Sequence, residues 1–372
     1  MLTYKRTLSL STLRSKESFT IFDFLPPADS HFMTGSVRNG LEAIIGELGM
    51  TNKDTVLLPA FVAQGVISPF QKKNINIAFY KCNADLKFDA EDIKKKISGN
   101  KAVKCIVIIH YFGFPQYIEE LKSFCAENNV VLFEDCAQAL FSKDANGKLL
   151  GSTGDISFFS LPKSLPVPDG AVFIVNNDKY KYITEKIKSS YGFSINHKLA
   201  VFFHFWFLLI KNIETKFNYG IISRILNFKT SALYVIYYFF LRRINKPVKV
   251  SKLSLKILSK INYKDFIDKR KTNIALIYDR INRNRYQLMF RDHNSNYMLT
   301  GVPLLSKERN TIVKEFKKRK NIECLCYLRG WDFFPKGTHE FDSELEVFNT
   351  HYLLPIKENS DIQYMVNILS DK

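Results

Sequence analysis

The sequence has no paired cysteines, no apolar segment of membrane-spanning length and few acidic residues relative to basic ones. Its six cysteines include no CxxC pair, and its seven histidines form no cluster at zinc-finger spacing. These absences exclude a zinc module and a disulfide framework, so no metal site is predicted. The N-terminal 16 residues also lack an apolar core followed by a cleavage site, so no secretory signal is expected. These features predict a cytoplasmic protein whose thiols are mostly buried and reduced.

Basic residues exceed acidic ones by 54 to 36, which gives a formal net charge of +18. Such a charge attracts nucleic acid, anionic lipid or a phosphate-bearing metabolite. The basic residues are spread over many segments and no RNA- or DNA-binding motif is present, so nucleic acid is not an expected partner.

The 372 residues are more than one core usually holds, and 46% of them are hydrophobic. Disorder and collagen are therefore excluded.

Between residues 36 and 178, short apolar runs alternate with longer stretches of helical period, which predicts a parallel sheet with crossover helices. The predicted strands are 55–59, 75–80, 105–110, 130–135, 156–160 and 171–176, and the predicted helices are 38–48, 62–71, 90–97 and 117–128. We expect residues 1–180 to form one large α/β domain that includes an N-terminal arm.

Residues 181–249 are predicted to form a helical, aromatic and basic insertion. Its two apolar runs, 199–210 and 232–241, are too short to span a membrane. Aromatic helices flanked by positive charge can lie in a membrane interface, so residues 196–249 could attach the chain peripherally to the inner membrane face. The alternative is that they pack against the domain or a partner subunit.

Residues 250–372 are expected to form a smaller α+β domain, with helices near 263–282 and 306–320 and a strand-like stretch at 297–303.

Two polar segments follow predicted strands, where ligands of open parallel sheets bind. Asp135 ends the strand "VVLFED", and Gln138 follows one turn later. Asp135 either pairs with a positively charged ring nitrogen in a buried site or caps a short helix. Lys163 follows the strand "ISFFS" in a turn of three prolines and a glycine. A desolvated lysine loses its proton readily and can attack a carbonyl to form a Schiff base.

The ordered motifs "SVRNGL", "DTVLLPAF", "IVIIHYFGFP", "FEDCAQA" and "GDISFFSLPKSLPVPDGAVFIVNND" resemble the DegT/DnrJ/EryC1/StrS family of sugar aminotransferases, which depend on pyridoxal 5'-phosphate (PLP). The similarity is clearest over residues 30–180 and weaker towards the C-terminus. It implies fold type I of the PLP-dependent transferases. This is an α/β fold with a large, mostly parallel sheet domain, flanking helices and a smaller C-terminal α+β domain.

The resemblance implies roles for individual residues. Lys163 would bind the cofactor covalently and move protons, Asp135 would keep the pyridine nitrogen protonated, and Gln138 would contact the ring hydroxyl. The helix that begins near Ser36 and Arg38 would hold the cofactor phosphate.

Four further residues are weaker candidates. Ser157 or Ser160 would add a hydroxyl to the phosphate site, and Phe61 is the candidate to stack on the cofactor. His110 either faces the substrate or is a hydrogen-bonded structural histidine. The chain departs from the family pattern at Phe158, where the family's phosphate-binding serine usually lies, and it lacks the family's "NYRM" stretch.

The resemblance therefore implies an aminotransferase that moves an amino group from an amino acid, glutamate being the expected donor, to a nucleotide-linked keto sugar. The product would enter polysaccharide or secondary-metabolite biosynthesis, and the enzyme would be a homodimer. Two alternatives remain open at this point. One is a PLP-dependent sugar dehydratase, and the other is a catalytically degenerate, membrane-associated scaffold of the same fold.

Overall fold

The computed structural model describes residues 20–214, 221–320, 322–326, 339–356 and 361–370, so the predicted N-terminal arm lies outside the described residues. A seven-stranded sheet forms the centre of the larger part, in the order β1-β7-β6-β5-β4-β2-β3. Strands β3, β2, β4, β5 and β6 are parallel to one another. Strand β7 pairs antiparallel with β6, and the edge strand β1 pairs antiparallel with β7, so β1 runs in the same direction as the parallel strands. The mostly parallel sheet predicted from the sequence is therefore confirmed.

The strands of this sheet agree closely with the sequence pattern. They are β1 (His31–Thr34), β2 (Thr55–Pro59), β3 (Asn76–Tyr80), β4 (Val103–Ile109), β5 (Val131–Asp135), β6 (Ile156–Ser160) and β7 (Ala171–Val175). Every residue of β2, β5 and β7 is buried, as expected for strands covered on both faces. The sequence did not predict β1, a four-residue edge strand.

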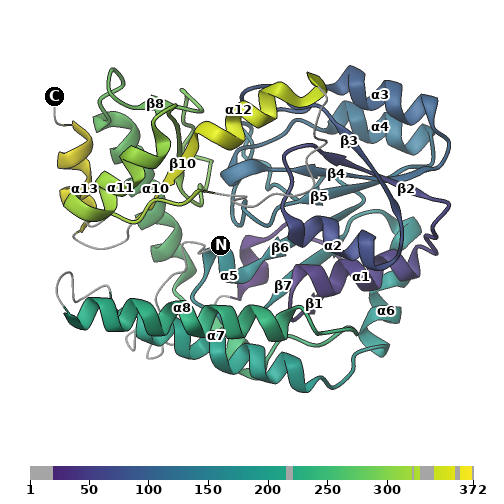
Figure 1. Cartoon of the computed structure of the whole chain (residues 1–372). Helices are drawn as coiled ribbons and strands as arrows, with labels where there is room; N and C mark the ends of the chain where they lie inside the picture. The colour runs from purple at the N-terminus through teal and green to yellow at the C-terminus, as the bar shows by residue number, and fades with distance from the viewer. Residues whose placement is uncertain (1–19, 215–220, 321, 327–338, 357–360, 371–372) are drawn as a thin grey trace.

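The helices of the large sheet follow the predicted alternation. They are α1 (Val37–Glu47), α2 (Gln64–Lys72), α3 (Ala90–Gly99), α4 (Glu119–Glu127), α5 (Leu161–Ser164) and α6 (Tyr182–Ser189), with 3₁₀ turns at Ile21–Phe24, Tyr111–Gly113 and Asp178–Tyr180. Side chains of α1, α2 and α6 share one hydrophobic core with one face of the sheet, and those of α3 and α4 pack on the opposite face. The sheet is therefore covered by helices on both faces (Figure 1).

The predicted insertion forms two long antiparallel helices, α7 (Ile195–Glu214) and α8 (Ile221–Leu241), which we call the α7–α8 hairpin. Each helix is longer than the apolar run that predicted it, because polar residues at the ends continue the helix. Figure 1 shows the pair lying side by side along one edge of the molecule. Within the described residues, no helix combines the length and the apolarity needed to cross a membrane.

The remaining elements form the smaller α+β part of the chain. They are α9 (Lys252–Leu258), α10 (Tyr263–Arg280), β8 (Gln287–Leu288), β9 (Val302–Leu305), α11 (Arg309–Lys320), the 3₁₀ turn His339–Phe341, α12 (Asp342–Thr350), β10 (His351–Leu354) and α13 (Asp361–Ser370). The three strands make a separate antiparallel sheet in the order β10-β9-β8. The strand expected at 297–303 begins only at Val302, because a turn at Asn294–Tyr297 precedes it.

Candidate functional site

A cavity of about 220 Å³ lies at the carboxyl ends of the parallel strands. Four of its lining residues come from the ends of, or the turns after, β2, β4, β5 and β6, namely Phe61, Ile109, Asp135 and Ser160. This is where open α/β sheets bind their ligands, because the loops that follow the strands diverge there. We call it the strand-end cavity. The start of α1 and both helices of the α7–α8 hairpin complete its walls.

Lys163 lines this cavity from the four-residue helix α5, which follows β6 directly. Pro162 provides the fixed backbone angle suited to the first turn, and the amide of Leu161 donates to the carbonyl of Gly170. Burial lowers the pKa of the Lys163 ammonium, and the charges of Asp135 and Tyr238 only partly oppose this. The amine is therefore more easily deprotonated than a surface lysine, as a nucleophile requires.

Asp135 faces the same cavity from the last position of β5. Its Oδ1 accepts a hydrogen bond of 2.8 Å from the amide of Ala137, which fixes the carboxyl group. Burial raises the pKa of Asp135, whereas the charge of Lys163 and the Ala137 amide act to lower it. The two predicted residues, 28 positions apart in sequence, are thus brought into one buried site where each senses the charge of the other.

Gln138 also lines the cavity, and its side chain is held in one orientation. Its Oε1 accepts a hydrogen bond of 3.0 Å from the amide of Phe112, a residue with φ of 58°. Non-glycine residues seldom adopt this left-handed conformation, which here turns the amide towards Gln138. Because Oε1 is occupied, the NH₂ group of Gln138 is the part left to donate to a bound molecule.

The N-terminus of α1 forms the anion-attracting wall of the cavity. Ser36 caps this helix by accepting from the amide of Asn39, and the first turn of any helix leaves amide groups without partners inside the helix. Arg38 lines the same wall and donates from Nη2 to the hydroxyl of Tyr238 at 3.2 Å. Its Nε is buried with no hydrogen-bond partner among the described residues. Together with Ser160, these groups make a cradle suited to a phosphate.

Phe61 lies in the cavity wall, as predicted for a stacking residue, but other aromatic rings hold it in place. Its ring meets the edge of Tyr111 at 5.7 Å and that of His351 at 5.4 Å. The hydroxyl of Tyr111 donates to the carbonyl of Phe61 at 2.5 Å. The smaller sheet, through His351 of β10, therefore helps to fix this wall.

Two predicted residues, Ser157 and His110, are absent from the cavity lining. The hydroxyl of Ser157 donates to the carbonyl of Gly151 at 2.5 Å, on the face of β6 opposite to that of its neighbours Ile156 and Phe158. Of the two alternatives weighed from sequence, the structure places only Ser160 at the cavity. For Ser157 this corrects the expectation, since a separation of three positions puts the two serines on opposite faces of a strand.

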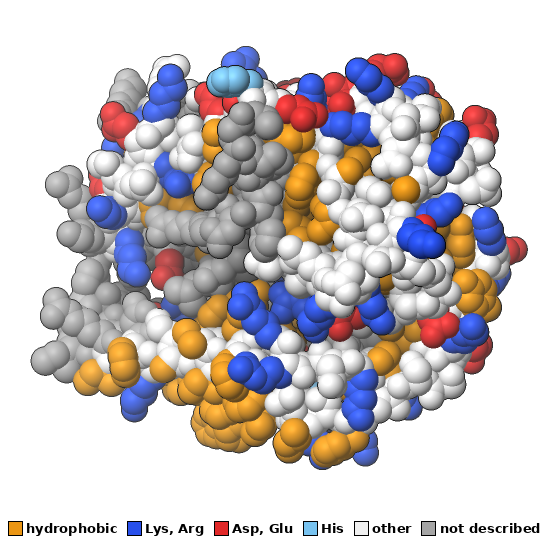
Figure 2. Space-filling model, turned by 45° about the vertical axis from the view of Figure 1, so that its right-hand side comes forward, with side chains coloured by type: hydrophobic (Ala, Val, Ile, Leu, Met, Phe, Trp, Pro, Cys, Tyr) orange, Lys and Arg blue, Asp and Glu red, His pale blue; other side chains and the backbone are white. Residues whose placement is uncertain are grey.

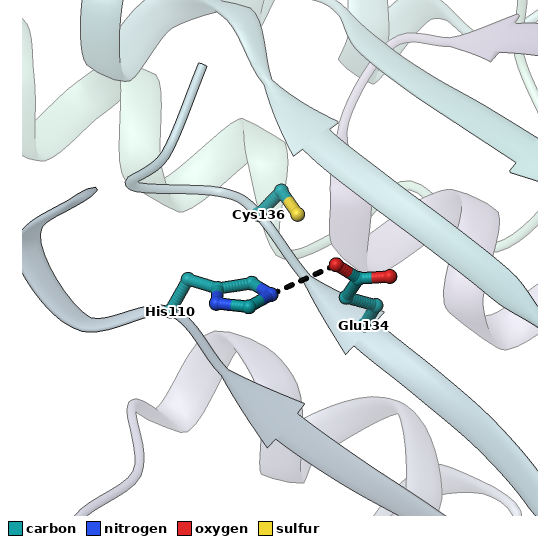
Figure 3. Close-up of side chains that lie close together, drawn as sticks. All are labelled: His110, Glu134 and Cys136. Atoms are coloured by element: carbon teal, nitrogen blue, oxygen red, sulfur yellow. Dashed lines mark hydrogen bonds and ion pairs between the residues drawn. The ribbon is translucent and has the colours of Figure 1, made fainter. Parts of the chain in front are cut away.

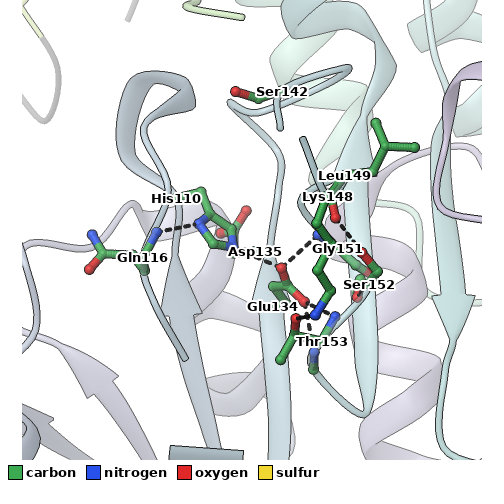
Figure 4. A network of polar contacts seen from close by, with 12 residues as sticks. His110, Gln116, Glu134, Asp135, Ser142, Lys148, Leu149, Gly151, Ser152 and Thr153 are labelled. Carbon is green, nitrogen blue, oxygen red and sulfur yellow. Dashed lines mark hydrogen bonds and ion pairs between the residues drawn. The ribbon is translucent and has the colours of Figure 1, made fainter. Parts of the chain in front are cut away.

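His110 is hydrogen-bonded through both ring nitrogens, which corresponds to the structural alternative (Figure 4). Its Nδ1 accepts from the amide of Gln116 and its Nε2 donates to Glu134 Oε1, both at 2.9 Å. Glu134 also accepts amide hydrogen bonds from Gly151, Thr153 and Gly154. Although burial acts to raise the pKa of Glu134, the His110 contact and these amides outweigh it and lower the pKa. The expected substrate contact through His110 is therefore not supported by its position.

His110, Glu134 and Cys136 form the one cluster among the described residues with the proximity of metal ligands (Figure 3). Their ligand atoms lie within 4.8 Å of one another and all three side chains are buried. The nitrogens of His110 and both oxygens of Glu134 are already used in the hydrogen bonds just described. We therefore interpret the cluster as a clamp that joins the ends of β4 and β5 and orients Asp135, which lies between Glu134 and Cys136.

The α7–α8 hairpin supplies cavity residues that the sequence analysis did not identify. His197, Tyr234, Tyr237 and Tyr238 all line the strand-end cavity. The three tyrosines recur at spacings of three and one on α8, and this polar stripe within a run of apolar residues was the available signal. Burial acts to raise the pKa of Tyr238, but the charges of Arg38 and Arg242 outweigh it, so the pKa is lowered.

Specific contacts attach this hairpin to the large sheet. His197 Nε2 lies 2.8 Å from Asp169 Oδ2, and Asp169 also accepts from the amide and hydroxyl of Ser251. The side chain of Asn39 on α1 holds the segment that follows α8, because it donates to the carbonyl of Lys246 and accepts from the amide of Val248. At Gly35 a Cβ atom would lie 2.8 Å from His197 Nε2, so only glycine permits this approach. The packing alternative for the insertion is thus realised within a single chain.

The model of the DegT/DnrJ/EryC1/StrS aminotransferase family matches residues 30–201. The predicted resemblance is confirmed. Among curated proteins, the GDP-perosamine synthases of Vibrio cholerae and Escherichia coli O157:H7 are each 31% identical to the chain, over 149 and 153 residues. These matches cover 38% and 40% of this chain, and 40% and 41% of the relatives. The chain thus matches about two fifths of the length of these curated relatives.

Solved structures resemble the chain over nearly its whole length. A putative sugar aminotransferase from Streptococcus pneumoniae, solved in its PMP form, has a TM-score of 0.69 at 12% identity and covers 100% of this chain and 98% of its own. A GDP-4-keto-6-deoxymannose-3-dehydratase with bound GDP-perosamine has a TM-score of 0.64 at 15% identity, covering 98% of this chain and 93% of its own. The expected fold is therefore confirmed, including the smaller C-terminal part.

Proposed function

We propose that this chain is a PLP-dependent aminotransferase that aminates a nucleotide-linked keto sugar, with an amino acid as donor and glutamate as the first candidate. The observation that carries the proposal is the single cavity that joins Lys163, Asp135 and the N-terminus of α1. The family match and the GDP-perosamine synthase relatives support the sugar-nucleotide substrate class. A formal charge of +18 favours an anionic substrate of this kind.

The residues of the cavity fit pyridoxal phosphate on chemical grounds. Lys163 offers an amine whose pKa is lowered, and Asp135 offers a buried carboxyl group. Arg38 offers a buried Nε that no described residue hydrogen-bonds. Lys163 would bind the cofactor's carbonyl group, and Asp135 would accept a hydrogen bond from its ring nitrogen. Gln138 would donate to the ring substituent, while Ser36, Arg38 and Ser160 would hold the phosphate. When bound, the cofactor supplies an electron sink and carries the amino group between the two half-reactions.

The protein's own contribution to the reaction follows from this arrangement. Lys163 Nζ, when neutral, would act as a base that takes the proton from the substrate carbon, and transamination requires that this proton is then delivered to the cofactor and not returned to the same carbon. The carboxylate of Asp135 would stabilise a protonated ring nitrogen, and this positive partner would in turn offset the burial that raises the pKa of Asp135. The tyrosines of α8 and the aromatic wall around Phe61 line the cavity beside these groups and would limit the access of water to a bound cofactor.

The proposal includes a homodimer, as expected from the family resemblance, and leaves the identity of the sugar and nucleotide to experiment. Sedimentation velocity of the purified protein tests the dimer. An oligomer of two chains is expected, whereas a monomer at micromolar concentration would remove this part of the proposal without touching the chemistry of the cavity.

Amination is tested by incubating the PLP-loaded enzyme with glutamate and a GDP-linked 4-keto-6-deoxy sugar and analysing the products by mass spectrometry. We expect an amino sugar together with 2-oxoglutarate, and we expect neither from Lys163→Ala. Lys122→Ala is the matched control, since this lysine is exposed and does not line the cavity. A deoxy sugar without added nitrogen would indicate dehydration instead. Absence of any product with a panel of amino donors and keto sugars would count against catalysis.

A further inference from the structure

The outward face of the α7–α8 hairpin carries most of the large apolar side chains that the described surface exposes. Ten of the fifteen such residues lie between positions 193 and 239. Six of them recur at helical spacings on the two helices, and we call these six the outer stripe: Phe202, Trp206, Ile213, Phe228, Val235 and Phe239. Figure 2 shows hydrophobic side chains gathered along the lower edge of the molecule, where Figure 1 places both helices.

This concentration exceeds what isolated exposed apolar residues explain. Phe228 is 76% exposed and Val235 is 68% exposed, although both lie in the middle of an ordered helix. The opposite face of the same helices already has contacts within the chain, because it lines the strand-end cavity and His197 hydrogen-bonds to Asp169. A contiguous apolar face of this kind on an otherwise ordinary surface marks a place where another body binds.

The charged residues of the hairpin and of the segment that follows it are almost all positive, and Arg243 lies over the ring of Phe239 in the outer stripe. Six cationic residues between positions 198 and 249 are exposed, namely Lys198, Lys229, Arg242, Arg243, Lys246 and Lys249. The same stretch of sequence contains a single acid, Glu214. That acid is already engaged, since it lies 2.8 Å from Lys211 and accepts from the hydroxyl of Thr230. Among the described residues of this stretch, no exposed acid is therefore left to attract a second copy. The neighbouring Glu323 is partly exposed but is paired with Lys211 and Lys317.

Two bodies could cover such a surface, and the charges distinguish them. A second copy of this chain, related by a two-fold axis, would bring two sets of these cations together, and like charges in apposition disfavour association. An anionic bilayer would instead receive the aromatic stripe in its interface and pair its headgroups with the surrounding lysines and arginines. No described helix is suited to cross the bilayer, so binding would be peripheral.

We propose that the outer stripe and its exposed cations bind the surface of an anionic lipid membrane. The hairpin then has two faces with different functions, one closing the strand-end cavity and the other contacting lipid. This inference concerns a surface away from Lys163 and Asp135, and it holds whether or not the chain transfers amino groups.

The test is flotation of the full chain with vesicles of phosphatidylcholine alone or mixed with phosphatidylglycerol. We expect binding to the mixed vesicles only, reduced at least tenfold by 0.5 M salt, because screening weakens the headgroup contacts. Trp206→Ser combined with Phe228→Ser should lower binding at least tenfold, as should Lys229→Glu combined with Arg243→Glu. The matched controls, Tyr364→Ser and Lys122→Glu, alter exposed residues elsewhere and should bind as the wild type does.

A second measurement locates the contact. The sequence contains two tryptophans, so Trp331→Phe leaves Trp206 as the reporter. Brominated phosphatidylglycerol vesicles should then quench its fluorescence. Absence of binding, or binding that leaves Trp206 unquenched, overturns the proposal. So does a dimer that the Trp206→Ser, Phe228→Ser variant converts to monomer in the absence of lipid, which would assign the face to a second copy. All outer-stripe variants should retain wild-type activity on soluble substrates, so failure here is separable from failure of the proposed function.

Discussion

His351 makes the stability of the protein depend on pH in a way that the structure quantifies. It is fully buried at the start of β10, its Nδ1 donates to the carbonyl of Val347 at 2.7 Å, and its ring packs on Phe61 and Phe112. Burial lowers its pKa from 6.5 to about 4. The unfolded chain therefore binds this proton between pH 6.5 and 4 while the folded chain does not, and stability falls as the pH falls through that window.

The size of this effect follows from the two pKa values. Below both pKa values the loss reaches about 3 kcal/mol, and between pH 8 and pH 5 it amounts to about 2 kcal/mol. The assay is urea unfolding at pH 8 and pH 5 for the wild type and for His351→Asn, whose amide keeps the bond to Val347 without titrating. The variant should lose about 2 kcal/mol less on acidification than the wild type does.

His339→Asn is the control, because it removes a histidine whose side chain is fully exposed, and it is compared with the wild type at the same two pH values. The reasoning fails if His351→Asn and the wild type lose equal stability between pH 8 and pH 5. It also fails if the variant loses more, since that would mean that protonated His351 is accommodated in the folded state.

Three further predictions concern the cavity and the helices that close it. Asp135→Asn removes a negative charge that partly supports the Lys163 ammonium, so the pH profile of lysine acylation should shift to lower pH; an unchanged profile would show that the two groups do not interact. Tyr238→Phe removes the hydroxyl bonded to Arg38, and equilibrium dialysis should show that pyridoxal phosphate binds about tenfold more weakly. Equal affinity would show that α8 does not contribute to phosphate binding. Gly35→Ala would place a methyl group against α7, and thermal unfolding should reveal a loss of about 1–3 kcal/mol, which an unaltered melting temperature would contradict.

The sequence was most informative for the buried strands, because the burial that shapes the sheet also makes the strand sequences apolar. The strands 55–59 and 156–160 agree residue for residue, because strands covered on both faces produce short segments that are mainly apolar. Lys163 and Asp135 could be selected because one follows such a strand and the other ends one, and the carboxyl ends of parallel strands meet at one edge.

The sequence was less informative where the direction of a side chain matters. Ser157 and Ser160 are chemically equivalent, and only the register of β6 decides which of them reaches the cavity. His110 follows β4 just as Asp135 ends β5, yet its ring turns away to Glu134. Tyr238 could not be assigned from sequence. It lies 75 positions after Lys163, and the two residues line the same cavity only because the hairpin folds back over it.

The most direct test of the whole account is to identify the lysine that pyridoxal phosphate modifies. The purified protein is saturated with the cofactor, reduced with borohydride to convert a lysine-bound carbonyl into a stable amine, digested and mapped by mass spectrometry. The account predicts one stoichiometric modification, at Lys163, which disappears in Lys163→Ala. Modification spread over exposed lysines, or the same extent of labelling at other positions in the variant, would contradict it.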